Sequence, residues 1–209
     1  MRQSRLAATV GIIRWVSARL ALFAYGSLVS PVSAERTLGR PVEEVEAVRL
    51  RGWRRRWSLA RDNLRCEKTF ARRDGSTPAY CLGLNIEHGA EGLEPNGALY
   101  EVTAAELDRL SLREMRYDRV DVTDALEPAV RGGFDRVFTF MAKRENFAPS
   151  PPADAVILAT YARAVETAFE ALGQRELGAF LETTGPYPVD VIEATLVRGR
   201  IPLGNPRDW

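Results

Sequence analysis

Two short stretches of this chain carry residue types that suit proton transfer on a small anionic substrate. The first is an apolar run that begins at Leu20 and stops abruptly in Tyr25, Gly26, Ser27 and Leu28. A strand that ends in glycine leaves backbone N–H groups unpaired, and such groups can converge on an anion without desolvating a charged side chain. The alternative for this 25–28 turn is a plain core strand followed by a turn.

The second stretch ends in Glu114, the candidate acid and base. The pattern around it predicts a helix that ends there and a strand that follows, so the carboxylate would lie at a helix-to-strand junction. A carboxylate held partly buried at such a junction can serve in proton transfer. The competing interpretation is a surface ion pair of Glu114 with Arg113 or Arg116.

A capping signal predicts the helix that positions Glu114, and the alternation of apolar and polar residues predicts the strands on either side of it. Thr103 and Glu106 have the spacing of a capping box, in which each side chain accepts from the other residue's backbone N–H. This spacing predicts a helix that runs from Thr103 to about residue 113. Strands are predicted at 97–102 and at 115–122, on either side of the helix.

The rest of the chain is predicted as strands followed by helices, which is typical of an α+β domain with a mixed or antiparallel sheet. The arginines between positions 49 and 56 favour a solvated strand face over an anion-binding patch. Further strands are expected at 45–57, 79–86 and 134–141, helices at 153–172 and 174–183, and loops at 29–40 and 62–78.

Composition narrows the classes of function. The chain has 209 residues, 45% of them hydrophobic and 27% charged, which indicates one domain with a sizeable core. A net charge of +1 argues against nucleic acid as the main partner. Cys66 and Cys81 are too few for a disulfide framework or a zinc site. The single histidine, His88, leaves no multi-histidine metal site and no histidine-based triad, so neither a metal nor a cofactor is expected.

The N-terminal region has some features of a secretory signal, because basic residues precede an apolar run and residues 32–34 resemble a cleavage site. The basic region is long, however, and cleavage there would remove the 25–28 turn. No run reaches the ~20 apolar residues of a membrane-spanning helix. We therefore expect a cytoplasmic protein without a membrane partner.

Taken in order, these stretches resemble the signatures of the gamma-glutamylcyclotransferase-like superfamily. The apolar strand that closes in the 25–28 turn is similar to the superfamily's loop. The strand at 97–100, the helix that contains Leu107 and Asp108, and then Glu114 and Tyr117 before a strand are similar to its second signature. Residues 51–55 and 75–84 resemble, less specifically, the ChaC-type branch. The resemblance covers about residues 20–170.

The resemblance implies a small mixed β-barrel flanked by helices, spanning residues 19–198. Residues 1–18 would be an N-terminal extension. Residues 199–209 would be an extended C-terminal tail that covers the pocket or joins a partner. Neither segment has a counterpart in the pattern.

The resemblance also implies an activity, the cleavage of a gamma-glutamyl amide or peptide by intramolecular attack of the α-amine. The products are 5-oxoproline and a free amine, and the ChaC-type branch would suggest glutathione as the substrate. In this scheme Glu114 is the acid and base, and Tyr117 lines the pocket or hydrogen-bonds the substrate. The α-carboxylate and the developing oxyanion are bound by the backbone of Tyr25, Gly26, Ser27 and Leu28.

Two other functions remain open. The same loop and carboxylate would serve an amide hydrolase or acyltransferase, and a hydrolase would release free glutamate. Alternatively, the chain would be a catalytically silent gamma-glutamyl-binding or interaction module. The sequence does not predict the oligomeric state or the leaving group.

Overall fold

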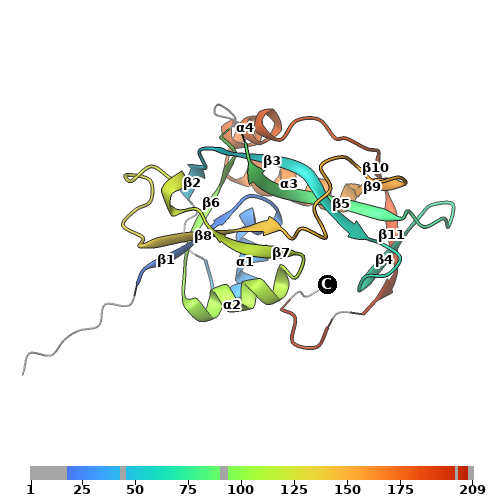
Figure 1. The fold of residues 1–209 in the computed structure, drawn as a ribbon, viewed down its shortest axis with the longest axis horizontal. Coiled ribbons are helices and arrows are strands. Elements are labelled where there is room, and N and C mark those ends of the chain that lie inside the picture. Colours follow the sequence, from blue (N-terminus) through green and yellow to red (C-terminus); the bar gives the residue numbers. More distant parts are fainter. Residues whose placement is uncertain (1–17, 43–45, 90–93, 201, 207–209) are drawn as a thin grey trace, which may run out of the picture.

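The strands form three sheets in the part of the chain that the computed structural model describes, namely residues 18–42, 46–89, 94–200 and 202–206 (Figure 1). The sheets have the strand orders β2-β6-β1-β8-β7, β10-β9-β5-β3 and β11-β4. The strands are β1 (Leu20–Ala24), β2 (Glu46–Arg49), β3 (Trp53–Asp62), β4 (Lys68–Arg72), β5 (Tyr80–His88), β6 (Asn96–Val102), β7 (Tyr117–Asp121), β8 (Arg136–Ala142), β9 (Ala155–Leu158), β10 (Val191–Ile192) and β11 (Ala194–Gly199).

Helices flank these sheets, which confirms the α+β class (Figure 1). The predicted capping box is present: the Glu106 N–H donates to Thr103 Oγ1 at 3.2 Å, and the Thr103 N–H donates to Glu106 Oε2 at 2.7 Å. Within the described ranges, no helix is both long and apolar enough to cross a membrane. The helices are α1 (Pro31–Leu38), α2 (Ala104–Arg113), α3 (Ala159–Ala171) and α4 (Gln174–Thr184), with short 3-10 turns η1 (Ser27–Val29) and η2 (Thr123–Ala125).

The two larger sheets are mixed and share one core. Strand β1 pairs antiparallel with β6 and parallel with β8, and β5 pairs antiparallel with β3 and parallel with β9. The sheets meet where the Asn85 side chain of β5 accepts from the Ala142 N–H of β8 at 2.7 Å. Buried side chains of both sheets, such as Phe23 and Leu84, pack in the same cluster. No backbone ladder among the described residues joins the sheets into one closed barrel.

Strand β1 is the centre of the five-stranded sheet, and it requires a glycine on its neighbour. Its register places Ala24 opposite Ala98 of β6, beside Gly97. A Cβ atom at Gly97 would overlap the Ala24 carbonyl oxygen and lie 2.7 Å from Cζ of Phe23. Only glycine permits this approach of the two backbones.

We expect Gly97→Ala to lower the free energy of unfolding by about 3 kcal/mol, the upper end of the usual cost of overpacking, because a backbone atom blocks the new methyl group. Urea denaturation measures this change. Gly178→Ala in α4 is the matched control: a Cβ there meets nothing within 4 Å, so it should leave stability unchanged or raise it by up to about 1 kcal/mol. Equal effects of the two variants would contradict the close approach.

The prediction of a loop at 29–40 is wrong, because α1 occupies most of it. The helix begins after Ser30, whose Oγ accepts from the Ser33 N–H, and Pro31 takes its first position. It ends at Gly39, which has the left-handed φ of 76°. Serine before proline at the start and glycine past the end are helix-boundary signals, and they were present in the sequence.

The single strand predicted at 45–57 is also wrong, because it is two strands. A turn at Gly52, with φ of 73°, separates β2 from β3. Strand β2 pairs with β6 and β3 with β5, so the two halves belong to different sheets. The residues 43–45 lie outside the described ranges.

Long-range pairing corrects two further predictions. The expected loop at 62–78 contains β4, whose partner β11 comes from the end of the chain. The expected helix at 153–172 begins as β9, which pairs with β5, and becomes helical only at Ala159. A short apolar run cannot be assigned to strand or helix from its periodicity alone, because the partner strand decides.

Candidate active site

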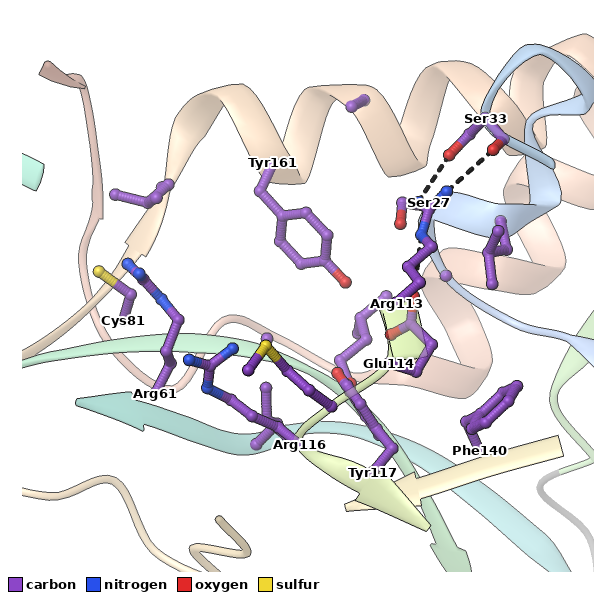
Figure 2. Close-up of a pocket in the computed structure, with 18 of the residues that line it drawn as sticks. Ser27, Ser33, Arg61, Cys81, Arg113, Glu114, Arg116, Tyr117, Phe140 and Tyr161 are labelled. Carbon is purple, nitrogen blue, oxygen red and sulfur yellow. Dashed lines mark hydrogen bonds and ion pairs between the residues drawn. The ribbon is translucent and has the colours of Figure 1, made fainter. Parts of the chain in front are cut away.

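One cavity of about 610 Å³ brings the two chemistry-bearing stretches together. Its walls come from β1 with the 25–28 turn, the junction of α2 and β7, strand β5 and the start of α3. Tyr25, Gly26, Ser27 and Leu28 line it, and so do Glu114 and Tyr117. In Figure 2, Ser27 and Glu114 lie at the same end of this space. Every residue that the sequence predicted for the site therefore contacts a single cavity.

The 25–28 turn presents backbone donors to this cavity. Strand β1 ends at Ala24, and the chain then tightens into η1, where the Gly26 carbonyl accepts from the Val29 N–H at 2.9 Å. The N–H groups of Gly26, Ser27 and Leu28 donate no hydrogen bond within the described part of the chain. Three successive donors at a cavity wall form a concavity suited to an anion or an oxyanion.

The Tyr25 side chain anchors the turn. Its hydroxyl donates to the Phe140 carbonyl oxygen of β8 at 2.6 Å, and the residue is 7% exposed. Burial raises the pKa of Tyr25 well above its ordinary value, so this hydroxyl stays protonated as a donor. Tyr25 therefore supports the turn through its side chain.

Glu114 is buried in an ion pair. It caps the end of α2, where its N–H donates to the Leu110 carbonyl oxygen at 2.8 Å, and it is 8% exposed. Its Oε1 lies 3.0 Å from Nε of Arg113. The competing sequence interpretation named Arg113 as a partner but placed the pair on the surface. Arg116, the other partner it considered, pairs with Glu67.

Arg113 fixes Glu114 to helix α1. Its guanidinium donates to the Ser33 carbonyl oxygen at 2.9 Å and to Ser33 Oγ at 2.8 Å (Figure 2). It also donates to Thr37 Oγ1. These bonds satisfy the charged group in a buried setting, which is the condition for such an ion pair to be tolerated. The helix that the sequence analysis missed thus holds the carboxylate in place through Arg113.

Two tyrosines line the cavity between its ends (Figure 2). Tyr117, at the start of β7, donates its hydroxyl to the Leu84 carbonyl oxygen at 2.7 Å. Tyr161, from α3, lies in the segment expected to be helical at 153–172 and was not among the predicted site residues. A Cβ atom at Gly26 would lie 3.5 Å from the Tyr161 hydroxyl, so this hydroxyl faces the turn.

Arg55 is the largest departure from the sequence-based expectation. Its neighbours Arg54 and Arg56 are partly exposed, as a solvated strand face predicts, but Arg55 is 1% exposed. Its guanidinium lies 4.8 Å from the ring centre of Phe169 and 4.4 Å from that of Phe180. Burial lowers the pKa of Arg55 to about 9, so the group stays protonated at neutral pH.

Arg55 supports the 25–28 turn from outside the cavity. It donates to the Tyr25 carbonyl oxygen at 3.3 Å and to the Asn96 carbonyl oxygen at 2.6 Å, which ties the end of β1 to the start of β6. It also donates to Thr184 Oγ1 of α4 at 2.8 Å. Alternation with Trp53 and Trp57, both buried, was the signal that placed Arg55 on the inner face.

The described part of the C-terminal tail reaches the cavity. Pro206 contributes to its wall, as does Leu196 of β11, which lies just before the tail. The Asn205 side chain donates to the Leu112 carbonyl oxygen of α2 at 2.7 Å. Across the described ranges, no group of three or more His, Cys, Asp or Glu side chains is arranged to hold a metal ion.

The fold of this chain is similar to that of proteins whose structures have been solved. The chain is similar to YkqA from Bacillus subtilis, with a TM-score of 0.52 and 17% identity over 82% of this chain and 56% of YkqA. It is also similar to a protein described as a gamma-glutamyl cyclotransferase, with a TM-score of 0.50 and 15% identity over 84% of this chain and 94% of that one. At these identities the likeness shows the fold. Protein-family models and curated protein sequences gave no match.

Proposed function

We propose that this chain, which has the gamma-glutamyl cyclotransferase-like fold, converts a gamma-glutamyl amide or peptide into 5-oxoproline and a free amine. One observation carries the proposal: the unpaired N–H groups of the 25–28 turn and the buried Glu114 carboxylate, far apart in sequence, line the same cavity. We also propose residues 19–198 as the domain that performs the reaction.

In the proposed complex the 25–28 turn binds the negatively charged end of the substrate. The N–H groups of Gly26, Ser27 and Leu28 hydrogen-bond the α-carboxylate and the γ-carbonyl oxygen. Tyr117 and Tyr161 form the walls that keep the gamma-glutamyl chain folded back on itself. Because the nucleophile is tethered to the electrophile, holding this conformer supplies most of what the reaction needs.

Glu114 moves two protons, one after the other, in the proposed reaction. Its carboxylate takes a proton from the substrate's α-ammonium group, and the freed amine attacks the γ-carbonyl carbon, forming the ring C–N bond. The carbonyl oxygen carries the negative charge of the tetrahedral intermediate, and the turn's N–H groups stabilise it. When the intermediate collapses, the original amide C–N bond breaks, and the carboxyl proton of Glu114 passes to the leaving nitrogen. The regenerated carboxylate then takes the second proton from the ring nitrogen and passes it to the released amine, which leaves as an ammonium ion. Atoms and charge balance without a cofactor.

The experiment is a panel of gamma-glutamyl amides and peptides incubated with the full chain, with products separated by chromatography. We expect 5-oxoproline and the free amine in equal amounts. Release of free glutamate instead would identify an amide hydrolase. Thermal stabilisation by the panel without any product would identify a binding module. Either result would overturn the proposed reaction.

A further inference from the structure

The cavity is larger than a gamma-glutamyl group requires. Its volume of about 610 Å³ lies in the range of cavities that hold drug-sized ligands, about 300–1,000 Å³, whereas a gamma-glutamyl group is much smaller. In Figure 2, Ser27 and Glu114 lie at one end of the space, Cys81 lies at the other, and Tyr161 stands between the two ends. A gamma-glutamyl group bound by the 25–28 turn therefore leaves the Cys81 end for the group that the amide nitrogen carries.

The Cys81 end is bounded by a small apolar cluster that is distinct from the main core. Cys81, Leu158, Phe70 and Tyr161 pack in this cluster, and all four line the cavity. Leu196 of β11 also lines the cavity and is the cross-strand partner of Phe70. Because cross-strand partners lie on the same face of a sheet, Leu196 extends the apolar wall that Phe70 begins.

Some of the apolar side chains that line the cavity expose much of their surface. Leu196 is 45% exposed, and Met115, at the junction of α2 and β7, is 36% exposed. Phe70 is only partly buried. Water contact with large apolar side chains in a cavity is unfavourable, so a ligand that covers them gains free energy by burying its own apolar surface against theirs. Exposed apolar surface of this kind marks a ligand-binding groove.

The charged side chains at the Cys81 end interact with one another. Arg116 pairs with Glu67, with Nη1 of Arg116 3.1 Å from Glu67 Oε1, and both side chains are about one-tenth exposed. Burial raises the pKa of Glu67, but the hydrogen bonds and charge of Arg116, together with the charge of Arg61, outweigh it and hold that pKa below its ordinary value. Arg61 also donates to the Lys68 carbonyl oxygen at 2.7 Å, and Lys68 is buried. A ligand at this end therefore meets more apolar than charged surface.

Building on the proposed function, we propose that the Cys81 end is a subsite for a large apolar group on the leaving amine. The substrate class is then the gamma-glutamyl amides of aromatic or long-chain alkyl amines, which carry neither a carboxylate nor a second amino group. Phe70, Met115 and Leu196 contact the apolar group. They select the substrate and do not take part in bond cleavage.

The first test uses matched substrates with the unmodified full chain. Gamma-glutamyl-2-phenylethylamide and gamma-glutamyl-ethylamide differ by a phenyl ring, and the hexylamide and the 5-aminopentylamide differ by a terminal methyl group against an ammonium group. We expect kcat/KM for the apolar member of each pair to exceed that of its partner by about 10-fold or more, which is about 1.4 kcal/mol. Most of the difference should be in KM. Gamma-glutamyl-phenylalanine, which adds a carboxylate to the phenylethylamide, should not be the better substrate.

The second test changes the apolar wall. Leu196→Gln should raise KM for the phenylethylamide about 5-fold and leave the ethylamide unaffected, whereas Leu196→Met, which keeps the wall apolar, should retain the preference. Phe70→Gln is a second variant at the cross-strand position and should act in the same direction. Val197→Gln is the matched control, because Val197 is the next residue, is 59% exposed and is not among the described residues that line the cavity.

The outcomes separate this proposal from the proposed reaction. Equal kcat/KM within either pair, or a preference that survives in both Leu196→Gln and Phe70→Gln, would overturn the apolar subsite while the cyclotransferase reaction stands. A clear preference for gamma-glutamyl-phenylalanine over the phenylethylamide would also overturn it and indicate a carboxylate subsite.

Calorimetry covers the case in which the chain forms no product from any of these compounds. Tighter binding of the phenylethylamide than of the ethylamide, weakened in Leu196→Gln but not in Val197→Gln, would then support the apolar subsite while the proposed reaction fails. If neither product nor binding is detected, both proposals fail.

Discussion

Replacing Glu114 by glutamine should lower kcat for 5-oxoproline formation by about 10²–10⁴-fold, the usual contribution of a positioned general acid or base. The amide has nearly the same shape as the carboxylate, and its oxygen can still accept from Arg113 Nε. It cannot take the proton of the α-ammonium group or return one to the leaving nitrogen. The loss should therefore be in kcat, and KM should change little.

Steady-state kinetics with the best substrate of the panel measures this effect, and circular dichroism verifies the fold. Asp108→Asn, at an exposed carboxylate on the same helix, is the matched control and should retain kcat. If Glu114→Gln keeps kcat within a few-fold of the unmodified chain, Glu114 is not the acid and base. A residual activity restored by raising the pH would show instead that deprotonating the α-amine was its main task.

The local signals around Glu114 predicted this end of the site well. The capping box fixes where α2 begins, and the helix length then places Glu114 at its end, as observed. The turn after β1 likewise follows from an apolar run closed by glycine. The α+β fold that the resemblance implied is confirmed, and a solved structure described as a gamma-glutamyl cyclotransferase is similar to it. Among the described residues, no backbone ladder closes the sheets into a barrel.

The contacts that hold the site together could not be read from the sequence. Arg113 of α2 hydrogen-bonds Ser33 and Thr37 of α1. No sequence pattern around Arg113 predicts those partners. Strand β4 pairs with β11, which lies more than 100 residues later in the sequence. Local periodicity carries no information on such pairings, because the partner, and not the segment, decides whether a strand forms.

The burial of Arg55 likewise could not be predicted from the residues around it. An arginine among arginines is ordinarily a solvated residue, and burial of a guanidinium is costly without compensation. Here Asn96 of β6 and Phe180 and Thr184 of α4 accept hydrogen bonds from the guanidinium. Residues remote in sequence therefore offset the free-energy cost of burying it. The alternation of Arg55 with Trp53 and Trp57 along β3 was the only sequence pattern that indicated an inward orientation of the Arg55 side chain.

Replacing Arg55 by methionine should lower the free energy of unfolding by about 2–4 kcal/mol. The change relieves the burial of a charge, which is favourable, but it leaves at least the Asn96 carbonyl oxygen and Thr184 Oγ1 without a donor, at about 1–3 kcal/mol each. Loss of the two ring contacts adds to the cost. The cost of leaving these acceptors without a donor should exceed the gain from removing a buried charge. Urea denaturation measures the difference.

Arg56→Met, at a partly exposed position of the same strand, is the control and should change the free energy of unfolding by less than about 1 kcal/mol.

The same variant tests whether Arg55 positions the 25–28 turn. Under conditions where Arg55→Met is fully folded, we expect KM for the gamma-glutamyl substrate to rise about 10-fold, since the Tyr25 carbonyl oxygen loses its anchor and the turn's N–H groups lose their alignment. Arg55→Lys should recover part of the stability but little of the KM, because one ammonium group cannot span the acceptors that the guanidinium joins. An unchanged KM in a folded Arg55→Met protein would restrict Arg55 to a structural role, and other contacts, such as the Tyr25–Phe140 hydrogen bond, would then position the turn.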